Sequence, residues 1–218
     1  MEQHELAAEA RAFADRLRGL FNKTVCHGLP INGVTYSTPR GPRAVVGYDV
    51  ASDNLAARPM PIHRCKTTAA LYAIVSYTLA PDEQGQYPMV VSSTLGLALD
   101  AEGKRGLFHA DYERDKADGY PETHLQVYAG SDDWDAVLAQ RNRSLGKLHL
   151  PAGGRRYRST AEDLIEFLIA EDLAEPREGW QVVLQAQRKD FEERQLRAAV
   201  RANPSVAREA LRDVDEQA

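Results

Sequence analysis

The sequence predicts an α+β protein with a central antiparallel sheet that helices cover on one face. Alternating apolar and polar residues between positions 63 and 128 indicate about four main strands. Short turn segments separate these strands, which favours a meander in which strands adjacent in the sequence pair. An amphipathic helical pattern precedes the strands, and apolar helical patterns follow them. We therefore expect an N-terminal helix and C-terminal helices on the apolar face of the sheet.

The first part of the chain predicts one helix and two short strands. Leucine and phenylalanine recur at helical spacing over residues 2–22, with charged residues between them. Residues 22–61 are rich in Gly, Pro, Asn and Ser, and their short apolar runs at 33–36 and 44–48 are expected to be strands. The two arginines within residues 38–43 lie in a turn that we expect to be solvated.

The middle of the chain predicts the sheet. Residues 63–79 are rich in Thr, Tyr, Ile and Val, and residues 89–99 resume the alternation after a turn. Residues 107–128 predict a hairpin, because strand patterns at 107–113 and 123–128 flank a loop that contains an Asp-Gly step and a proline.

Two helix starts carry recognisable caps. Ser131 is placed to cap a short helix over residues 132–141, whose first turn is acidic as the helix dipole favours. Thr160 and Asp163 approximate a capping box ahead of a strongly apolar helix. We expect that apolar helix to pack against the sheet.

Gly179 separates this part of the chain from a helical C-terminal segment. Helices are expected over residues 180–202 and 204–214, the second beginning at an Asn-Pro step. We therefore divide the chain into an α+β domain over residues 1–176 and a helical extension over residues 177–218 that packs on the same domain.

Composition excludes several classes of protein. The 218 residues are 43% hydrophobic and 27% charged, which is typical of a globular protein and not of a disordered or fibrous one. A net charge of -5 argues against non-specific coating of nucleic acid. No apolar run approaches the ~20 residues of a membrane span, and residues 1–21 lack the apolar core of a secretory signal. We expect a cytoplasmic protein in which Cys26 and Cys65 are free thiols.

One face of the predicted hairpin gathers ionisable side chains. Alternation places His109 and Asp111 on one face of the first strand, with His124 and Gln126 on the same face of the second. If the loop closes symmetrically, Asp111 lies opposite His124, and His109 lies opposite Gln126, within contact distance. Hydroxyl side chains on the two preceding strands are placed to continue this polar face: Ser76, Thr78, Ser92 and Thr94.

This polar face has three interpretations. Two imidazoles and a carboxylate suit acid–base chemistry without a cofactor, in which one imidazole takes a proton, the other donates one and the carboxylate fixes a tautomer. The same set suits a metal site made of two histidines and one carboxylate. The simplest interpretation is a solvated sheet face, on which alternating polar residues are ordinary.

A second cluster lies in the loop over residues 148–158. Guanidinium groups present a planar fork that suits phosphate, and a Gly-Gly step lets the backbone approach an anion. The loop lacks the ending of a Walker motif and the spacing of a dinucleotide fingerprint, and arginines that cap neighbouring helices would explain it without a ligand. Its candidate anion-binding side chains are His149, Arg155, Arg156 and Arg158.

Several short runs together resemble an uncharacterised bacterial protein family with the same order of elements. These runs are FHADYE, HLQV, LHLP, GGRRYR and STAEDLIEFLI, in chain order. Some similar small α+β proteins are encoded near toxin–antitoxin or phage-defence genes, so the resemblance implies a nuclease-like or nuclease-regulating role. It implies no specific activity and no catalytic residues.

The sequence thus favours a hydrolase that acts on a phosphodiester, in RNA or in a nucleotide, without a cofactor. In this hypothesis His109 and His124 are the acid and the base, Asp111 orients them, and the loop arginines bind the anion. The alternative is a non-catalytic interaction or regulatory module whose C-terminal helices bind a partner protein or a second copy. Trp180 and the apolar positions that follow it motivate this alternative.

Overall fold

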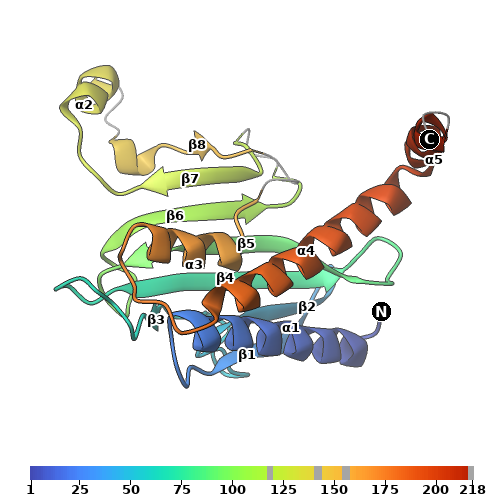
Figure 1. The fold of residues 1–218 in the computed structure, drawn as a ribbon, viewed down its shortest axis with the longest axis horizontal. Helices are drawn as coiled ribbons and strands as arrows, with labels where there is room; N and C mark the ends of the chain where they lie inside the picture. Colours follow the sequence, from blue (N-terminus) through green and yellow to red (C-terminus); the bar gives the residue numbers. More distant parts are fainter. Residues whose placement is uncertain (117–119, 140–143, 154–157, 216–218) are drawn as a thin grey trace.

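The computed structural model describes residues 1–218 except residues 117–119, 140–143, 154–157 and 216–218. Helices and one antiparallel sheet make up the described chain (Figure 1). The elements are α1 (Gln3–Thr24), β1 (Ile31–Thr38), β2 (Gly41–Tyr48), β3 (Met60–Pro61), β4 (Tyr72–Pro81), β5 (Pro88–Ala98), β6 (Gly106–Glu113), β7 (Thr123–Val127), α2 (Asp132–Leu138), a 3-10 turn η2 (Leu145–Lys147), β8 (Leu150–Pro151), α3 (Ala161–Ala170), α4 (Trp180–Ala202) and α5 (Pro204–Asp215).

The sheet is larger than the sequence predicted. Its strands run in the order β1-β2-β4-β5-β6-β7-β8, with β3 beside β4, so the described residues contain eight strands and not about four. The predicted meander is confirmed within it, because β4, β5, β6 and β7 pair consecutively and antiparallel. The two short strands predicted near the N-terminus, β1 and β2, extend this meander at one edge.

The long strand predicted over residues 63–79 is wrong in its first half. Strand β4 begins only at Tyr72, and the segment before it is irregular. Its backbone bonds run to other partners: Arg64 N–H donates to the Val25 carbonyl, and Lys66 N–H donates to the Leu173 carbonyl. The β-favouring composition of this segment is therefore overridden by contacts with distant loops.

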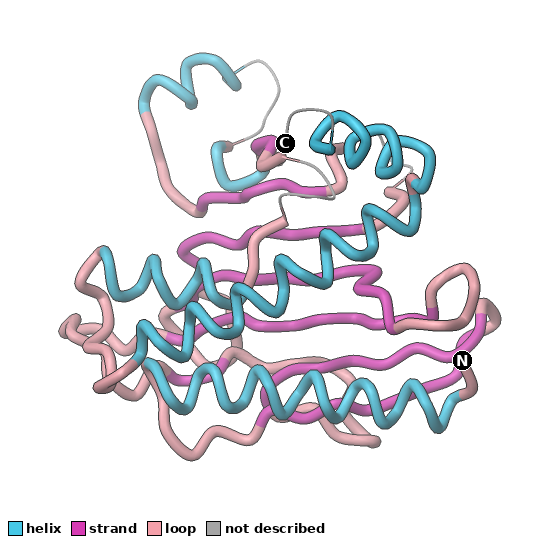
Figure 2. Tube along the Cα trace, turned by 45° about the vertical axis from the view of Figure 1, so that its right-hand side comes forward, coloured by secondary structure: helices cyan, strands magenta, loops and turns pink. Residues whose placement is uncertain are grey.

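One face of the sheet is covered by α1, α3 and the first part of α4 (Figures 1 and 2). Alternation along β4 decides which side chains face these helices, since Ala73, Val75 and Tyr77 are buried while Ser76 and Thr78 are only half-buried. The largest buried side chains of α1 fill the same core: Leu6, Leu17, Leu20 and Phe21.

Ion pairs as well as apolar packing hold α3 and α4 together. The predicted capping box at Thr160 and Asp163 is present at the start of α3. Arg188 of α4 pairs with two α3 carboxylates, at 3.2 Å from Asp163 Oδ1 and 2.7 Å from Glu166 Oε2. Leu184 is buried on the core side of α4. These contacts fix the first half of α4 against the body of the protein.

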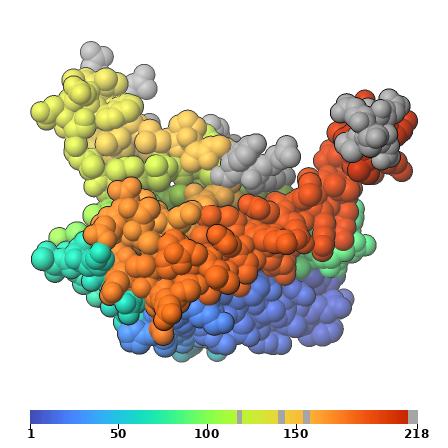
Figure 3. Space-filling view, in the orientation of Figure 1, coloured from blue at the N-terminus to red at the C-terminus, as the bar shows by residue number. Residues whose placement is uncertain are grey.

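The chain beyond the middle of α4 extends away from the sheet, and α5 lies at its end (Figure 3). Helix α2 also lies away from the core, near the opposite end of the molecule (Figure 1). The predicted Ser131 cap of α2 is present, with its hydroxyl accepting from the Trp134 N–H. The helix ends at Leu138, so the prediction that it reaches residue 141 falls partly outside the described residues. Cys26 and Cys65 are free thiols, as predicted.

Candidate functional site

The two faces of strand β6 carry different chemistry. Phe108, Ala110 and Tyr112 face the helices, where the Phe108 ring meets the Phe167 ring of α3 edge-on at 5.5 Å between centroids. Successive side chains of a strand point to opposite faces. His109 and Asp111 therefore point to the face away from α1, α3 and α4, as the alternation predicts.

The predicted register of the hairpin is confirmed. In the pairing of β6 with β7, Asp111 lies opposite His124 and His109 lies opposite Gln126. The pairing of β5 with β6 places Thr94 beside Asp111, and the pairing of β4 with β5 places Ser76 beside Thr94. A continuous polar row therefore crosses four strands, and the hydroxyl residues extend the histidine face as predicted.

A single carboxylate oxygen lies between the two imidazoles. Asp111 Oδ2 is 3.1 Å from His109 Nε2 and 3.7 Å from His124 Nε2. The other oxygen, Asp111 Oδ1, is buried and has no hydrogen-bond partner among the described residues. A buried acceptor left unpaired costs about 1–3 kcal/mol, and such groups in folded proteins call for an explanation.

The second nitrogen of each imidazole also has a polar neighbour. His109 Nδ1 is 3.0 Å from the Tyr128 hydroxyl, and His124 Nδ1 is 3.3 Å from the Pro121 carbonyl oxygen. His124 is only 1% exposed, so it cannot meet a substrate directly. The Tyr128 hydroxyl, on a residue that is 48% exposed, is consequently the end of this chain nearest to solvent.

Two glycines hold the Tyr128 ring in place. A β-carbon added at Gly106 would lie 2.8 Å from two carbons of that ring, and one added at Gly146 would lie 3.3 Å from a third. Tyr128 also continues the strand pairing, because its N–H donates to the Leu107 carbonyl at 2.9 Å. Only residues without a side chain leave room for the ring beside His109.

The pKa values of the three hydrogen-bonded side chains, Tyr128, His109 and Asp111, are shifted in directions that fit together. A hydrogen bond to Asp111 raises the pKa of His109 above its usual value, and burial opposes it only in part. Burial acts to raise the pKa of Asp111, but hydrogen bonding to His109 and to Thr94, together with the charge of the two imidazoles, outweighs it, so the pKa is lowered. Burial and the Asp111 charge raise the pKa of Tyr128. An imidazolium, a carboxylate and a neutral phenol are favoured together.

His149 belongs to this site. Its ring lies 4.6 Å from the His124 ring and 4.2 Å from the Tyr120 ring, measured between centroids. It directly precedes β8, which pairs with β7 so that Pro151 lies opposite His124. His149 was predicted to bind an anion with the loop arginines, and its position makes it part of the cover over His124.

The loop arginines do not all join the histidines. Arg158 is stacked between the Tyr112 ring at 5.4 Å and the Phe191 ring at 5.5 Å, on the helix-covered face of the sheet. Arg158 therefore does not lie with the hairpin histidines, because the sheet separates them, and its role as an anion-binding residue stays a prediction. Arg155 and Arg156 lie outside the described residues.

The metal interpretation is not supported by the donor geometry. Within the part of the chain that the structure describes, no three His, Cys, Asp or Glu side chains are arranged to hold a metal ion.

Tyr128 was not among the predicted site residues. Alternation places it on the same face as His124 and Gln126, so its side of the sheet was readable from the sequence. Its contact with His109 was not, because the contact depends on the ring lying between Gly106 and Gly146.

Comparisons with protein-family models, curated proteins and solved structures found no match to this chain. The resemblance to an uncharacterised bacterial family accordingly stays a prediction. None of the described helices combines the length and the apolar content that crossing a bilayer requires.

Proposed function

We propose that the hairpin face is the acid–base centre of a hydrolase that acts on a phosphodiester, in RNA or in a nucleotide. The observation that supports this most is the hydrogen-bonded chain from the Tyr128 hydroxyl through His109 to Asp111. It runs from an exposed phenol to a largely buried carboxylate. In this order Tyr128 can supply one proton at the surface, and His109 can then replace that proton.

The shifted pKa values fit a donor role for Tyr128. With His109 protonated, its Nδ1–H donates to the phenolic oxygen, and the phenolic proton is free to point outward. As water attacks the phosphorus and the P–O bond to the leaving group breaks, the leaving oxygen takes the phenolic proton and the His109 imidazolium passes its own proton to the phenolate. The proton of the attacking water goes to solvent. Asp111 keeps His109 oriented and charged.

His124 and His149 act in this proposal as positioning residues. His124 is buried against Asp111, and the His149 ring packs on His124 from outside. The sequence-based assignment of His124 as a direct acid or base is replaced, because a side chain that is 2% exposed cannot touch a substrate. Together the two rings limit solvent access to the carboxylate.

The choice of substrate class rests on the sequence. Arg155 and Arg156 follow Pro151, which pairs with His124, by four and five residues. Arginine suits the charge that develops on a phosphoryl group.

The proposal is tested with the Tyr128→Phe variant, which keeps the ring and removes only the hydroxyl. We expect it to lower hydrolysis of single-stranded RNA or of bis(4-nitrophenyl) phosphate by about 10²–10⁴-fold, as for loss of a general acid. The matched control is Tyr87→Phe, since Tyr87 is 45% exposed and lies in the connection between β4 and β5, outside the β6–β7 hairpin. Equal activity in the two variants, or no activity in the unmodified protein, would reject the proposal.

A second candidate function is an interaction module, favoured by apolar side chains exposed on α4 and α5. Leu196, Val206 and Leu211, on two consecutive helices, are each more than 60% exposed, and exposed apolar surface of this kind can mark an interaction site. We propose that they bind a partner protein or a second copy of the chain. Light scattering after size-exclusion chromatography tests the second copy: a dimer that becomes a monomer on removal of residues 203–218 is expected, and a monomeric unmodified protein would count against self-association.

A further inference from the structure

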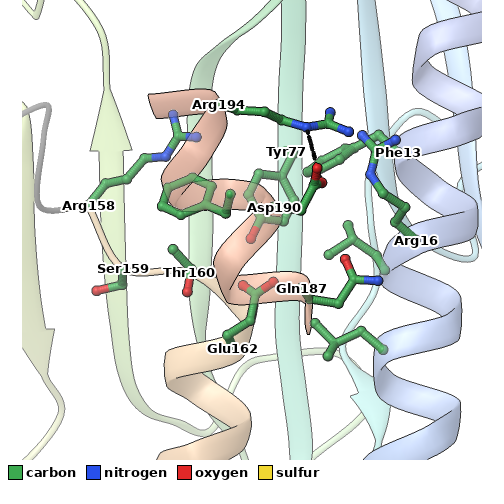
Figure 4. Close-up of a pocket in the computed structure, with 13 residues that line it drawn as sticks. Phe13, Arg16, Tyr77, Arg158, Ser159, Thr160, Glu162, Gln187, Asp190 and Arg194 are labelled. Carbon is green, nitrogen blue, oxygen red and sulfur yellow. Dashed lines mark hydrogen bonds and ion pairs between the residues drawn. The ribbon is translucent and has the colours of Figure 1, made fainter. Parts of the chain in front are cut away.

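A cavity of about 80 Å³ opens between α1, α4 and the residues that lead into α3 (Figure 4). Three arginines from three separate elements line it: Arg16 of α1, Arg158 ahead of α3 and Arg194 of α4. It lies on the helix-covered face of the sheet, whereas the Tyr128–His109–Asp111 chain lies on the other face. The cavity is therefore separate from the proposed acid–base centre.

Two of these guanidinium groups lack a carboxylate partner. Among the described residues, neither Arg16 nor Arg158 forms an ion pair, and each stacks on aromatic rings instead. Arg194 pairs with Asp190 at 3.0 Å. Asp190 and Glu162 line the same cavity, so its three guanidinium groups outnumber its two carboxyl groups by one.

Burial makes this excess charge unfavourable without a ligand. Desolvation lowers the pKa of Arg158. Desolvation, followed by the charge of Arg194, lowers the pKa of Arg16, although the charges of Asp190 and Glu9 act in the opposite direction. A cation removed from water without a partner loses solvation free energy that only an opposite charge or hydrogen bonds can restore. An anion that enters the cavity would supply both.

The remaining polar groups of the cavity are compatible with an anion. Burial raises the pKa of Glu162, so this carboxyl takes up a proton more easily than an exposed one. Protonation of this carboxyl lessens the repulsion that an entering anion meets.

We propose that this cavity binds a single phosphate group, held by Arg16, Arg158 and Arg194. Guanidinium forks match phosphate oxygens geometrically. Sites for drug-sized ligands occupy roughly 300–1,000 Å³, so a cavity of about 80 Å³ admits one small oxyanion and not a whole nucleotide. The phosphate is either free orthophosphate or the terminal group of a larger molecule whose remainder stays outside.

Calorimetric titration of the full chain with orthophosphate, at ionic strength held constant with chloride, tests this proposal. We expect saturable binding that Arg16→Met and Arg158→Met each weaken by about tenfold to a hundredfold, as for loss of a charge-assisted hydrogen bond. The matched control is Arg18→Met, because Arg18 lies on the same helix and pairs only with the exposed Asp15. That variant should bind as the unmodified protein does.

Titration with a nucleoside 5′-monophosphate distinguishes the two sources of phosphate. Binding at least tenfold tighter than orthophosphate indicates the terminal group of a larger ligand, and equal or weaker binding indicates the free ion. If Arg158→Met does not fold, the comparison of Arg16→Met with Arg18→Met decides alone. No saturable binding of either probe, or equal affinities in those two variants, would overturn the proposal. Tyr128→Phe should leave phosphate binding unchanged, so this test is independent of hydrolysis.

Discussion

His109 has a side-chain partner at each of its two ring nitrogens. Asp111 holds one side of the ring and Tyr128 the other. The imidazole is therefore fixed in orientation, and its charge depends directly on its neighbours. This makes its titration measurable as a change in protein stability.

The raised pKa of His109 fixes the sign of that change. A raised folded-state pKa stabilises the protein fully below the unfolded value of about 6.5, and this stability is lost as pH rises through the folded pKa. The lowered pKa of Asp111 acts at the other end: its contribution is present above about 3.9 and is lost as pH falls through the folded pKa. The pair therefore stabilises most between about pH 4 and pH 6.5.

The unmodified protein should lose stability as pH rises through the folded-state pKa of His109, and we expect the His109→Gln variant not to show this loss. The difference in free energy of unfolding between the unmodified protein and this variant should be larger at about pH 6 than at about pH 8.5, on the order of 1.4 kcal/mol per unit of pKa shift. Urea denaturation across this pH range measures it. A difference that does not change with pH would mean that Asp111 does not raise the pKa of His109.

At the scale of elements, the β6–β7 hairpin depends on small residues that lie outside its own polar face. Gly106 and Gly146 make room for the Tyr128 ring. Gly96 of β5 lets the backbone of β6 approach, since a β-carbon there would lie 2.2 Å from the Phe108 carbonyl oxygen and 2.8 Å from the His109 α-carbon. These glycines thus leave space for the Tyr128 ring and for the close approach of β6 to β5.

Gly106→Ala should displace the Tyr128 ring and cost about 1–3 kcal/mol, as overpacking usually does. The matched control is Gly19→Ala within α1, where an added β-carbon meets no atom within 4 Å and helix propensity predicts stabilisation of about 0.5–1 kcal/mol. Thermal unfolding measures both changes. If both variants gain stability, the ring is not held as described.

The sequence predicted the hairpin better than its surroundings, for physical reasons. Alternation with a period of two fixes both the faces and, with a symmetrical loop, the register of Asp111 against His124. It carries no information on the irregular segment before Tyr72, whose backbone bonds go to distant loops. It also cannot place Arg158, because a loop residue has no periodicity that assigns it to a face. His124 was expected at the surface, but the cover that buries it comes from His149, a residue far along the chain.

At the scale of the whole molecule, the sheet separates two groups of polar side chains, the histidines on one face and the cavity arginines on the other. Asp111 and Tyr112 are neighbours in β6, yet the first meets the histidines and the second meets Arg158. The helices that form the arginine cavity also complete the hydrophobic core through Leu184. The first part of α4 is therefore structural, although it belongs to the segment divided off at residue 177.

Two shortened chains separate these roles of the C-terminal segment. Removal of residues 203–218 should change the free energy of unfolding by less than about 1 kcal/mol, because the described α5 side chains are largely exposed. Removal of residues 180–218 takes Leu184, Val183 and Trp180 away from the core and should cost several kcal/mol, roughly 2 for each large apolar side chain. Urea denaturation compares the two. Equal stability of the two chains would show that α4 does not belong to the folded unit.

The unequal edges of the sheet affect how the protein behaves in concentrated solution. Strand β8 is only two residues long and ends at Pro151, which has no N–H to offer another strand. Strand β1 is eight residues long, and no described strand pairs with its outer side. Short or proline-bearing edges resist strand addition, whereas long regular ones invite it. Aggregation by edge-to-edge pairing is thus expected to start at β1. The β8 edge, next to the histidines, should then stay free of added strands.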